Sequence, residues 1–149
     1  MRTNFAMLIV ALSLVCSATR AKSQSSGQKC PVVLDHIDLN YNHEGGKSKP
    51  QLSVEFGNAT GKAITTVTFS LSVLDSAGYP HPYPEDLEYR DGLETTKQKT
   101  FTWNLAPESV DIHRAGETVL VREVEFADAT GWKDDGSESC VLTVDFHPR

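Results

Sequence analysis

The chain has 149 residues and a formal net charge of −6, with 23% charged and 39% hydrophobic residues. This length suits one ordinary domain with a core of its own. An acidic surface repels phosphate backbones and anionic lipids, which argues against nucleic acids and membrane surfaces as partners.

The N-terminus has the pattern of a secretory signal peptide. A short basic start precedes an apolar run from Phe5 to Val15, and small residues follow as far as Ala21. The apolar run has about ten residues, whereas a membrane span needs about twenty. We therefore predict a signal peptide over residues 1–21, cleaved after Ala21 or after Ala18, and no transmembrane segment after cleavage.

Cys16 permits a second interpretation, as the lipid-modified first residue of a bacterial lipoprotein. The residue before such a cysteine is normally small, and Val15 is not. We therefore favour an exported chain that is periplasmic or extracellular. Cleavage removes Arg2 and Arg20 but no acid, so the mature chain of 128 residues has a formal charge of −8.

Two cysteines remain after cleavage, Cys30 and Cys140. An exported protein lies in an oxidising compartment, where such a pair forms a disulfide. Two free thiols, or a bridge between two copies, are the alternatives. An intramolecular bridge would close a loop of about 110 residues, for which chain-entropy theory gives about 4 to 5 kcal/mol of stabilisation.

The first part of the mature chain alternates between polar segments and strand patterns. Residues 22–29 contain no apolar side chain and predict a flexible leader, so that structure begins at Cys30. Residues 32–40 mix β-branched and charged side chains and predict a first strand. Residues 42–50 are polar, contain two glycines and predict a loop.

The clearest strand patterns lie in the middle of the chain. Leu52, Val54 and Phe56 alternate with polar residues, as in a strand with one buried face. The tetrapeptide 58–61, Asn-Ala-Thr-Gly, predicts a turn. Residues 64–75 predict the longest strand, with one apolar face made by Val67, Phe69, Leu71 and Val73.

The second half begins with the segment 79–84, Tyr-Pro-His-Pro-Tyr-Pro, which does not fit a central strand because three prolines remove three ladder donors. Residues 85–93 are acidic and predict no particular element. Alternation returns at residues 96–105, 119–126 and 140–146, and each of these segments predicts a strand.

These patterns predict six or seven strands and no amphipathic helix. The expected fold is all-β, an immunoglobulin-like antiparallel β-sandwich over residues 30–149, closed by the single disulfide. The sequence also repeats itself once, because residues 56–62 resemble residues 126–132, seventy positions later. We attribute this echo to two turns of the same chemistry rather than to duplication of a domain.

Residues 54–64 and 69–78 together resemble the FxLYD-type modules of exported bacterial proteins. In those modules one strand ends in Asn plus a small polar residue, and a second ends in an aliphatic residue, Asp and Gly. This chain has no Tyr before Asp75. Residues 124–132 resemble a strand and turn of uncharacterised secreted bacterial proteins. The resemblance implies an immunoglobulin-like fold and a role in binding or envelope organisation, without catalytic residues.

No pattern predicts a catalytic, cofactor or metal site. A metal site usually has ligands at short, regular spacing. The five histidines of this chain do not show such spacing: His36, His43, His81, His113 and His147. Serine hydrolases often carry a Gly-x-Ser-x-Gly elbow, which is also absent. Residues 85–88 and 134–138 hold carboxylates that could bind calcium but lack the alternate spacing of a calcium loop, so solvated loops are expected.

The proline-rich segment is the best candidate for recognition. Its prolines favour an extended conformation that holds Tyr79, His81 and Tyr83 outward at little entropic cost. The alternative is a rigid connection whose tyrosines cover the edge of the sandwich. Trp132 follows a turn and is expected to be exposed, whereas Trp103 belongs to an apolar face. The candidate binding surface therefore consists of Tyr79, His81, Tyr83 and Trp132.

Together these observations predict an exported, non-enzymatic binding or structural module without a cofactor. Its expected partner is another envelope or secreted protein, contacted through a sheet edge or the proline-rich segment. One alternative is a metal-dependent or hydrolytic enzyme, which would need at least three of the histidines and nearby carboxylates to converge. Another is a carbohydrate-binding module that uses Trp132 as a stacking platform.

Overall fold

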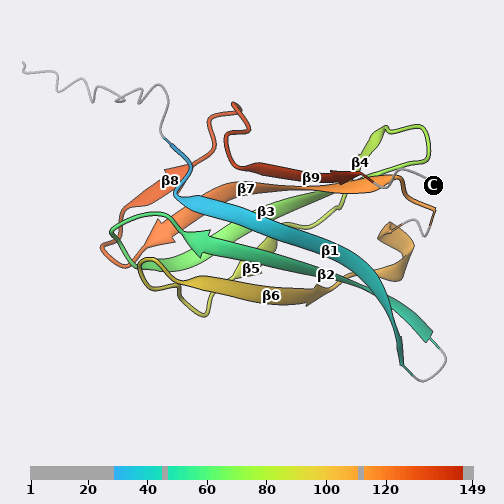
Figure 1. Cartoon of the computed structure of the whole chain (residues 1–149), viewed down its shortest axis with the longest axis horizontal. Helices are drawn as coiled ribbons and strands as arrows, with labels where there is room; N and C mark the ends of the chain where they lie inside the picture. Colours follow the sequence, from blue (N-terminus) through green and yellow to red (C-terminus); the bar gives the residue numbers. More distant parts are fainter. Residues whose placement is uncertain (1–28, 45–46, 111–112, 146–149) are drawn as a thin grey trace, which may run out of the picture.

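The structure, a computed structural model, describes residues 29–44, 47–110 and 113–145 and forms two layers of antiparallel strands (Figure 1). The predicted signal peptide, leader residues 22–28 and His147 lie outside the described residues. The elements are β1 Val32–Glu44, β2 Lys47–Asn58, β3 Ile64–Leu74, β4 Pro80–Pro82, β5 Leu87–Tyr89, β6 Gln98–Asn104, the 3₁₀ helix η1 Pro107–Ser109, β7 Gly116–Phe126, β8 Gly131–Lys133 and β9 Val141–Asp145.

The first sheet has the strand order β1-β2-β6. The side chains of Leu52, Val54 and Phe56 alternate as predicted and are fully buried. The predicted loop over residues 42–50 is wrong, because β1 and β2 pair as far as Glu44 and Lys47. A polar hairpin of this kind is held by backbone hydrogen bonds and needs no apolar face, so its sequence resembles a loop. Figure 1 shows this hairpin extending beyond the rest of the sheet.

The second sheet is built on β3 and β7, which pair with each other along most of their length. On the far side of β3, β4 pairs with residues 72–74 and β5 with residues 67–69. On the far side of β7 lie β8 and β9. The sequence missed β4, β5 and β8 because each has three residues, too few to show a period of two.

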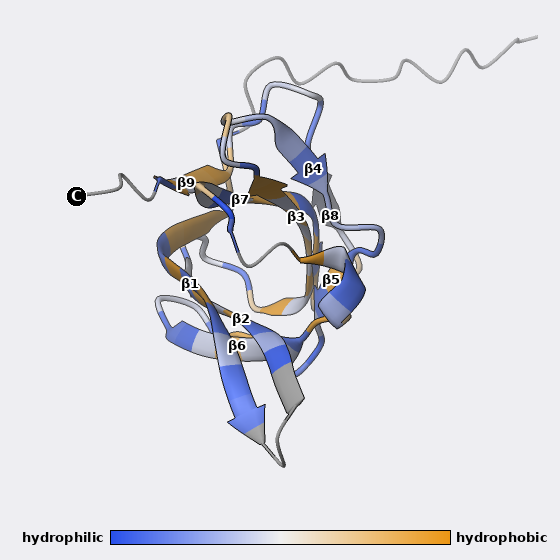
Figure 2. Ribbon diagram, turned by 90° about the vertical axis from the view of Figure 1, so that its right-hand side faces the viewer, coloured by the Kyte–Doolittle hydropathy of each residue, from blue (hydrophilic) through white to orange (hydrophobic). Residues whose placement is uncertain are grey.

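The strand order confirms the predicted antiparallel sandwich. A three-stranded sheet of β1, β2 and β6 faces a sheet in which β3 and β7 are central and β9 is at one side. This arrangement matches the first, second and fifth strands of an immunoglobulin-like sandwich packed against its third, sixth and seventh. Figure 2 shows the two layers from another side, with hydrophobic stretches on strands of both layers, such as β1 and β3, and hydrophilic residues on β4.

An aromatic cluster joins the two sheets. The ring of Phe56 lies 5.1 Å from those of Phe69 and Tyr89, and both contacts are edge-to-face. Phe101 and Trp103 on β6 extend the cluster toward the edge of the sandwich, where both are half-buried. Edge-to-face contacts between rings stabilise a core by more than the burial of the apolar area of the rings alone.

The predicted disulfide between Cys30 and Cys140 is present, with the two Cα atoms 5.4 Å apart. Cys30 precedes β1 and Cys140 directly precedes β9. The bond therefore joins the start of the first strand in one sheet to the start of the last strand in the other. The bond therefore connects edge strands of different layers, which no backbone ladder connects. It differs in place from the central bridge of antibody domains.

The outer edge of β1 is closed by a buried ion pair. The backbone N–H of Leu39 donates to Oε1 of Glu117 at 3.3 Å, and Nη2 of Arg114 donates to the Leu39 carbonyl. The Nε atom of Arg114 lies 3.3 Å from Oε2 of Glu117, and the two side chains are 11% and 1% exposed. The pair thus satisfies the N–H and the C=O of Leu39 on an edge that has no neighbouring strand.

The described residues contain no α-helix, and none of them forms a helix long and apolar enough to span a membrane.

Candidate functional site

The loop that joins β3 to β4 is fixed by a single carboxylate. The Oδ1 atom of Asp75 accepts hydrogen bonds from the backbone N–H groups of Ala77 and Tyr79, both at 2.9 Å. Its Oδ2 atom lies 2.9 Å from Nε2 of His81. Gly78 completes the turn with φ of 82°, a conformation that costs glycine little. Local sequence therefore dictates this turn, since Asp and Gly occupy the positions that an Asx-type turn requires.

The loop presents Tyr79 to solvent. This tyrosine is 68% exposed, the largest value among the exposed large hydrophobic side chains of the described residues. His81 lies on β4, and its side chain is also exposed. β4 is a short edge strand, as expected for a segment rich in proline. Two of the four predicted surface residues thus lie close together, Tyr79 on this loop and His81 on the strand that follows it.

Tyr83 does not belong to this surface, contrary to the prediction. It is 9% exposed, its hydroxyl accepts a hydrogen bond from the backbone N–H of Ala106, and its own N–H donates to the Leu71 carbonyl. The side chain of a tyrosine next to prolines can point to the solvent or to the core, and here its hydroxyl is hydrogen-bonded to the loop after β6. Tyr83 is therefore the anchor of the proline-rich segment.

Trp132 is also buried, contrary to the prediction, with 3% of its surface exposed. It lies on β8 opposite Val124, a pairing that a three-residue strand does not reveal in the sequence. Trp103, expected in the core, is half-buried at the sandwich edge and donates its indole N–H to the Glu88 carbonyl. The carbohydrate-binding alternative requires Trp132 to be an exposed stacking platform for a sugar. The buried position of this ring does not meet that requirement.

A surface pocket of about 280 Å³ adjoins the loop. Its apolar part comes from Val73 and Val110, and its polar part from Asp75, His81, Glu108 and Ser109. Glu108 and Ser109 belong to η1, which follows β6 and lies far from the loop in sequence. The sequence offered no sign of this pairing, because it depends on the two sheets packing together.

Electrostatics holds the loop carboxylate in its charged form. The hydrogen bond with His81, followed by those from the backbone of Tyr79 and Ala77, lowers the pKa of Asp75 below its ordinary value of 3.8. Hydrogen bonds to a carboxylate favour the ionised state. The carboxylate therefore keeps the loop in place throughout the neutral and mildly acidic range.

Replacing Asp75 by alanine is expected to release this loop, because it removes the acceptor of three contacts. Amide exchange at Ala77 and Tyr79 should become faster, which hydrogen exchange measured by NMR will detect. In the wild type the folded pKa is depressed, so loop order should persist above pH 3.8 and decline only as the pH falls through the lowered pKa. Asp75→Asn is the matched control, since it keeps the Oδ1 acceptor. Unchanged exchange in Asp75→Ala would contradict the role given to this carboxylate.

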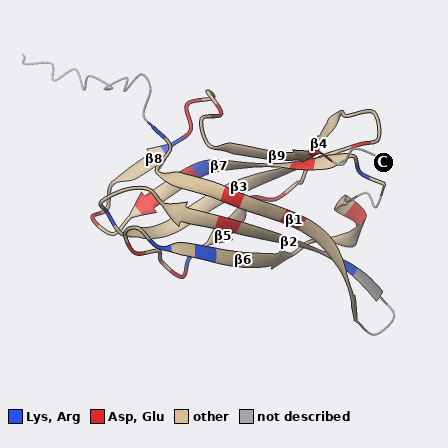
Figure 3. Cartoon of the chain, viewed as in Figure 1, with Lys and Arg blue, Asp and Glu red and all other residues tan. Residues whose placement is uncertain are grey.

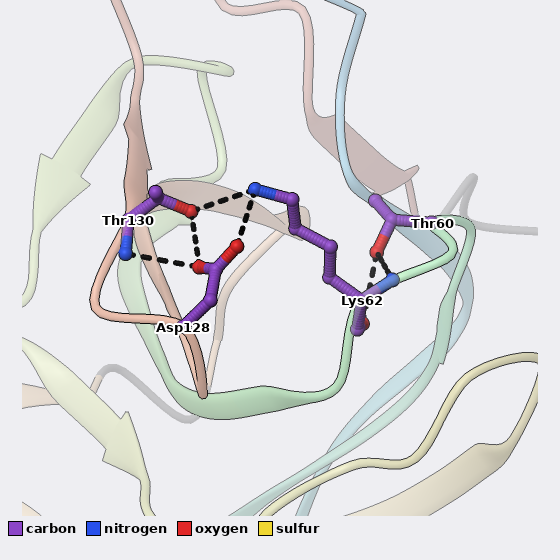
Figure 4. A network of polar contacts seen from close by, with 4 residues as sticks. All are labelled: Thr60, Lys62, Asp128 and Thr130. Carbon is purple, nitrogen blue, oxygen red and sulfur yellow. Dashed lines mark hydrogen bonds and ion pairs between the residues drawn. The ribbon is translucent and has the colours of Figure 1, made fainter.

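The two echoed turns lie side by side and are linked by a lysine (Figure 4). Asn58 and Asp128 each accept hydrogen bonds from the backbone N–H and the hydroxyl of the threonine two residues later. The Nζ atom of Lys62 lies 2.7 Å from Asp128 and 2.9 Å from the Thr130 hydroxyl. The shared turn chemistry was visible in the sequence, whereas the link between the turns was not.

The contacts of Asp128 lower its pKa to about 2, with the hydrogen bond from Lys62 as the largest cause and those from Thr130 next. Lys62 also lies 5.4 Å from the centre of the Phe126 ring. Both charged side chains are about half exposed. We interpret this network as a structural link between the two turns, because the charges of Lys62 and Asp128 are already paired with each other.

Among the described residues, no group of three His, Cys, Asp or Glu side chains is placed to hold a metal ion. In the acidic loop after β8, Asp134 and Asp135 accept hydrogen bonds from the N–H groups of Gly136 and Ser137. The expected solvated loop therefore uses at least two of its carboxylates to stabilise its own backbone.

No family model and no curated protein matches this chain. Solved structures are similar to it in fold. An X-ray structure of a hypothetical protein from Peptoclostridium difficile 630 has a TM-score of 0.54 at 11% identity and covers 75% of this chain and 90% of its own. The Northeast Structural Genomics Consortium target SoR45 has a TM-score of 0.46 at 7% identity, covering 76% and 84%. The first of these likenesses supports the fold alone.

Proposed function

We propose that this chain is an exported, non-enzymatic binding module that contacts another envelope or secreted protein through the loop at Tyr79. The observation that carries the proposal is the fixed, exposed position of this tyrosine. Three contacts to the Asp75 carboxylate hold the loop before any partner arrives, so little entropy remains to be lost on binding.

The chemistry of the loop suits protein recognition. Tyrosine combines a large apolar area with a hydroxyl and loses few rotamers on binding, which makes it common at interfaces. The neighbouring pocket adds two carboxylates, from Asp75 and Glu108, beside apolar Val73 and Val110. A partner that inserts a small polar or cationic side chain beside Tyr79 would fit this combination.

Export is part of the proposal. The signal peptide pattern at residues 1–21 and the disulfide between Cys30 and Cys140 both fit an oxidising compartment. The resemblance of residues 54–64 and 69–78 to FxLYD-type modules points to the same setting. We therefore expect the partner in the periplasm or outside the cell.

Site-specific photo-cross-linking in the organism that encodes the chain tests this proposal. A photoreactive phenylalanine at position 79 is expected to capture one defined partner, and capture should fall when Asp75→Ala releases the loop. Ser137, on an exposed loop elsewhere, is the control position. The proposal fails if position 79 captures nothing, or if both positions capture the same proteins equally.

The hydrolytic alternative rests on the same pocket. Asp75, His81 and Ser109 supply the residue types of a serine hydrolase. No hydrogen bond among the described residues joins Ser109 to His81, although a nucleophile must lie within hydrogen-bond reach of its base. We therefore expect a fluorophosphonate probe to leave Ser109 unlabelled. Labelling at Ser109 would overturn the non-enzymatic part of the proposal.

A further inference from the structure

Strand β6 is an edge strand of its sheet, and no described strand pairs with its outer edge. At the opposite side of its sheet, β1 is closed at Leu39 by the ion pair of Arg114 and Glu117. In the second sheet, β4, β5 and β8 have three residues each and β9 has five, whereas β6 has seven. Natural proteins shorten or cover their edge strands because an open edge pairs with other chains. An unpaired outer edge on a strand of seven residues therefore indicates that another chain could pair with β6.

The backbone of β6 alternates between its partner strand and the open edge. The carbonyl of Lys97 and the N–H of Leu105 bond to β2, so odd-numbered residues face β2. The N–H of Ala106 faces the other way and donates to the Tyr83 hydroxyl. Thr100 and Thr102 face outward as well, and their outward N–H and C=O groups belong to no described ladder, because β6 pairs with β2 alone.

Charge also sets β6 apart. Residues 95–104 contain no acid, and their charged residues are Lys97 and Lys99, in a chain whose net charge is −6. Figure 3 shows basic residues on β6 and acidic residues on the neighbouring strands of the same sheet. Two copies of this acidic protein can therefore approach along β6 without placing carboxylates of this strand against each other.

We propose that two copies of the chain pair through β6, antiparallel and around a two-fold axis at Phe101, to form one continuous six-stranded sheet. In this register Thr100 lies opposite Thr102 of the partner subunit, and the outward backbone groups of both residues become hydrogen-bonded. Threonine pairs are favourable across antiparallel strands. A two-fold axis needs a self-complementary edge, and this edge meets that requirement.

The remaining side chains agree with the same register. Lys99 lies opposite Trp103 of the partner subunit, where its ammonium group reaches an indole ring that is only half-buried in the single chain. The two Phe101 rings meet on the axis, which covers a second half-buried aromatic side chain. This pairing does not depend on the Tyr79 loop, because that loop belongs to the other sheet.

Sedimentation velocity of the purified, oxidised protein from micromolar to millimolar concentration tests the pairing. The wild type is expected to form a dimer that dissociates on dilution. Thr102→Pro should raise the dissociation constant by about 100-fold, since each dimer loses two backbone hydrogen bonds. The fold should survive, because this N–H has no partner in the single chain and proline is tolerated on edge strands.

Thr102→Ala is the matched control, because it shortens the side chain but keeps the backbone N–H, and it should still dimerise. Hydrogen exchange of the wild type provides a second measurement that needs no substitution, with protection at Thr100 and Thr102 rising with protein concentration. A wild type that stays monomeric throughout, or a dimer that persists unchanged in a folded Thr102→Pro variant, would overturn the proposal.

Discussion

Replacing both Cys30 and Cys140 by serine is expected to lower the free energy of unfolding by as much as about 4 to 5 kcal/mol. The two cysteines are 110 residues apart in the sequence, so the disulfide that joins them removes much of the conformational entropy of the unfolded chain. In the folded state it joins the beginnings of β1 and β9, which lie in different sheets. Its loss should therefore weaken the side of the sandwich where these strands meet.

Urea denaturation under oxidising conditions measures this effect, with the wild type and the double serine variant side by side. The wild type treated with a reductant is the control, and it should lose a similar amount of stability. An equal free energy of unfolding for the oxidised wild type and the variant would show that the disulfide does not act as a clamp. The double substitution avoids leaving a reactive free thiol.

Replacing Glu117 by alanine is expected to cost about 3 to 5 kcal/mol, because it breaks the buried ion pair between this carboxylate and the guanidinium of Arg114. The backbone N–H of Leu39 would lose its acceptor in the same step. Glu123→Ala is the matched control, since its ion pair with Lys133 is exposed, and it should change stability by less than about 0.5 kcal/mol. Equal effects of the two substitutions would contradict this interpretation of the edge of β1.

The pH dependence of stability gives a second test of Glu117. Burial raises the pKa of this carboxyl above its ordinary value of 4.5, although Arg114 acts in the opposite direction. The folded protein then binds its proton more tightly than the unfolded chain does. The contribution of Glu117 is therefore fully present below pH 4.5 and is lost as the pH rises through the folded pKa. Glutamine resembles the protonated carboxyl and does not titrate, so the wild type should lose stability relative to Glu117→Gln as the pH rises through the folded pKa.

The core strands were predictable because each buries one face. The alternation of Leu52, Val54 and Phe56, and that of the apolar residues between Val67 and Val73, states directly which side chains enter the core. The disulfide was predicted from the two cysteines that follow the expected signal peptide. Turn chemistry at Asn58 and Asp128 was equally local, and both turns have the hydrogen bonds that their sequence requires.

The candidate site was only half predictable. Asp75 and Gly78 define a local turn, so the exposure of Tyr79 could be anticipated from nearby residues. The direction of Tyr83 could not, because its hydroxyl is held by Ala106 on a distant loop. Trp132 was mistaken for an exposed ring because its strand is too short to recognise and its neighbour, Val124, lies on β7.

The sequence by itself determined the longer core strands, the turns at Asn58, Asp75 and Asp128, and the bond between Cys30 and Cys140, because these properties depend on local periodicity and on residue type. Only the tertiary structure decided which edges are closed and which aromatic rings stay exposed. The outward backbone groups of Leu39 on β1 are bonded to Arg114 and Glu117, which lie 75 and 78 residues further along the chain, while no described strand pairs with the outer edge of β6. Such contacts join residues far apart in the chain, and no local pattern encodes them.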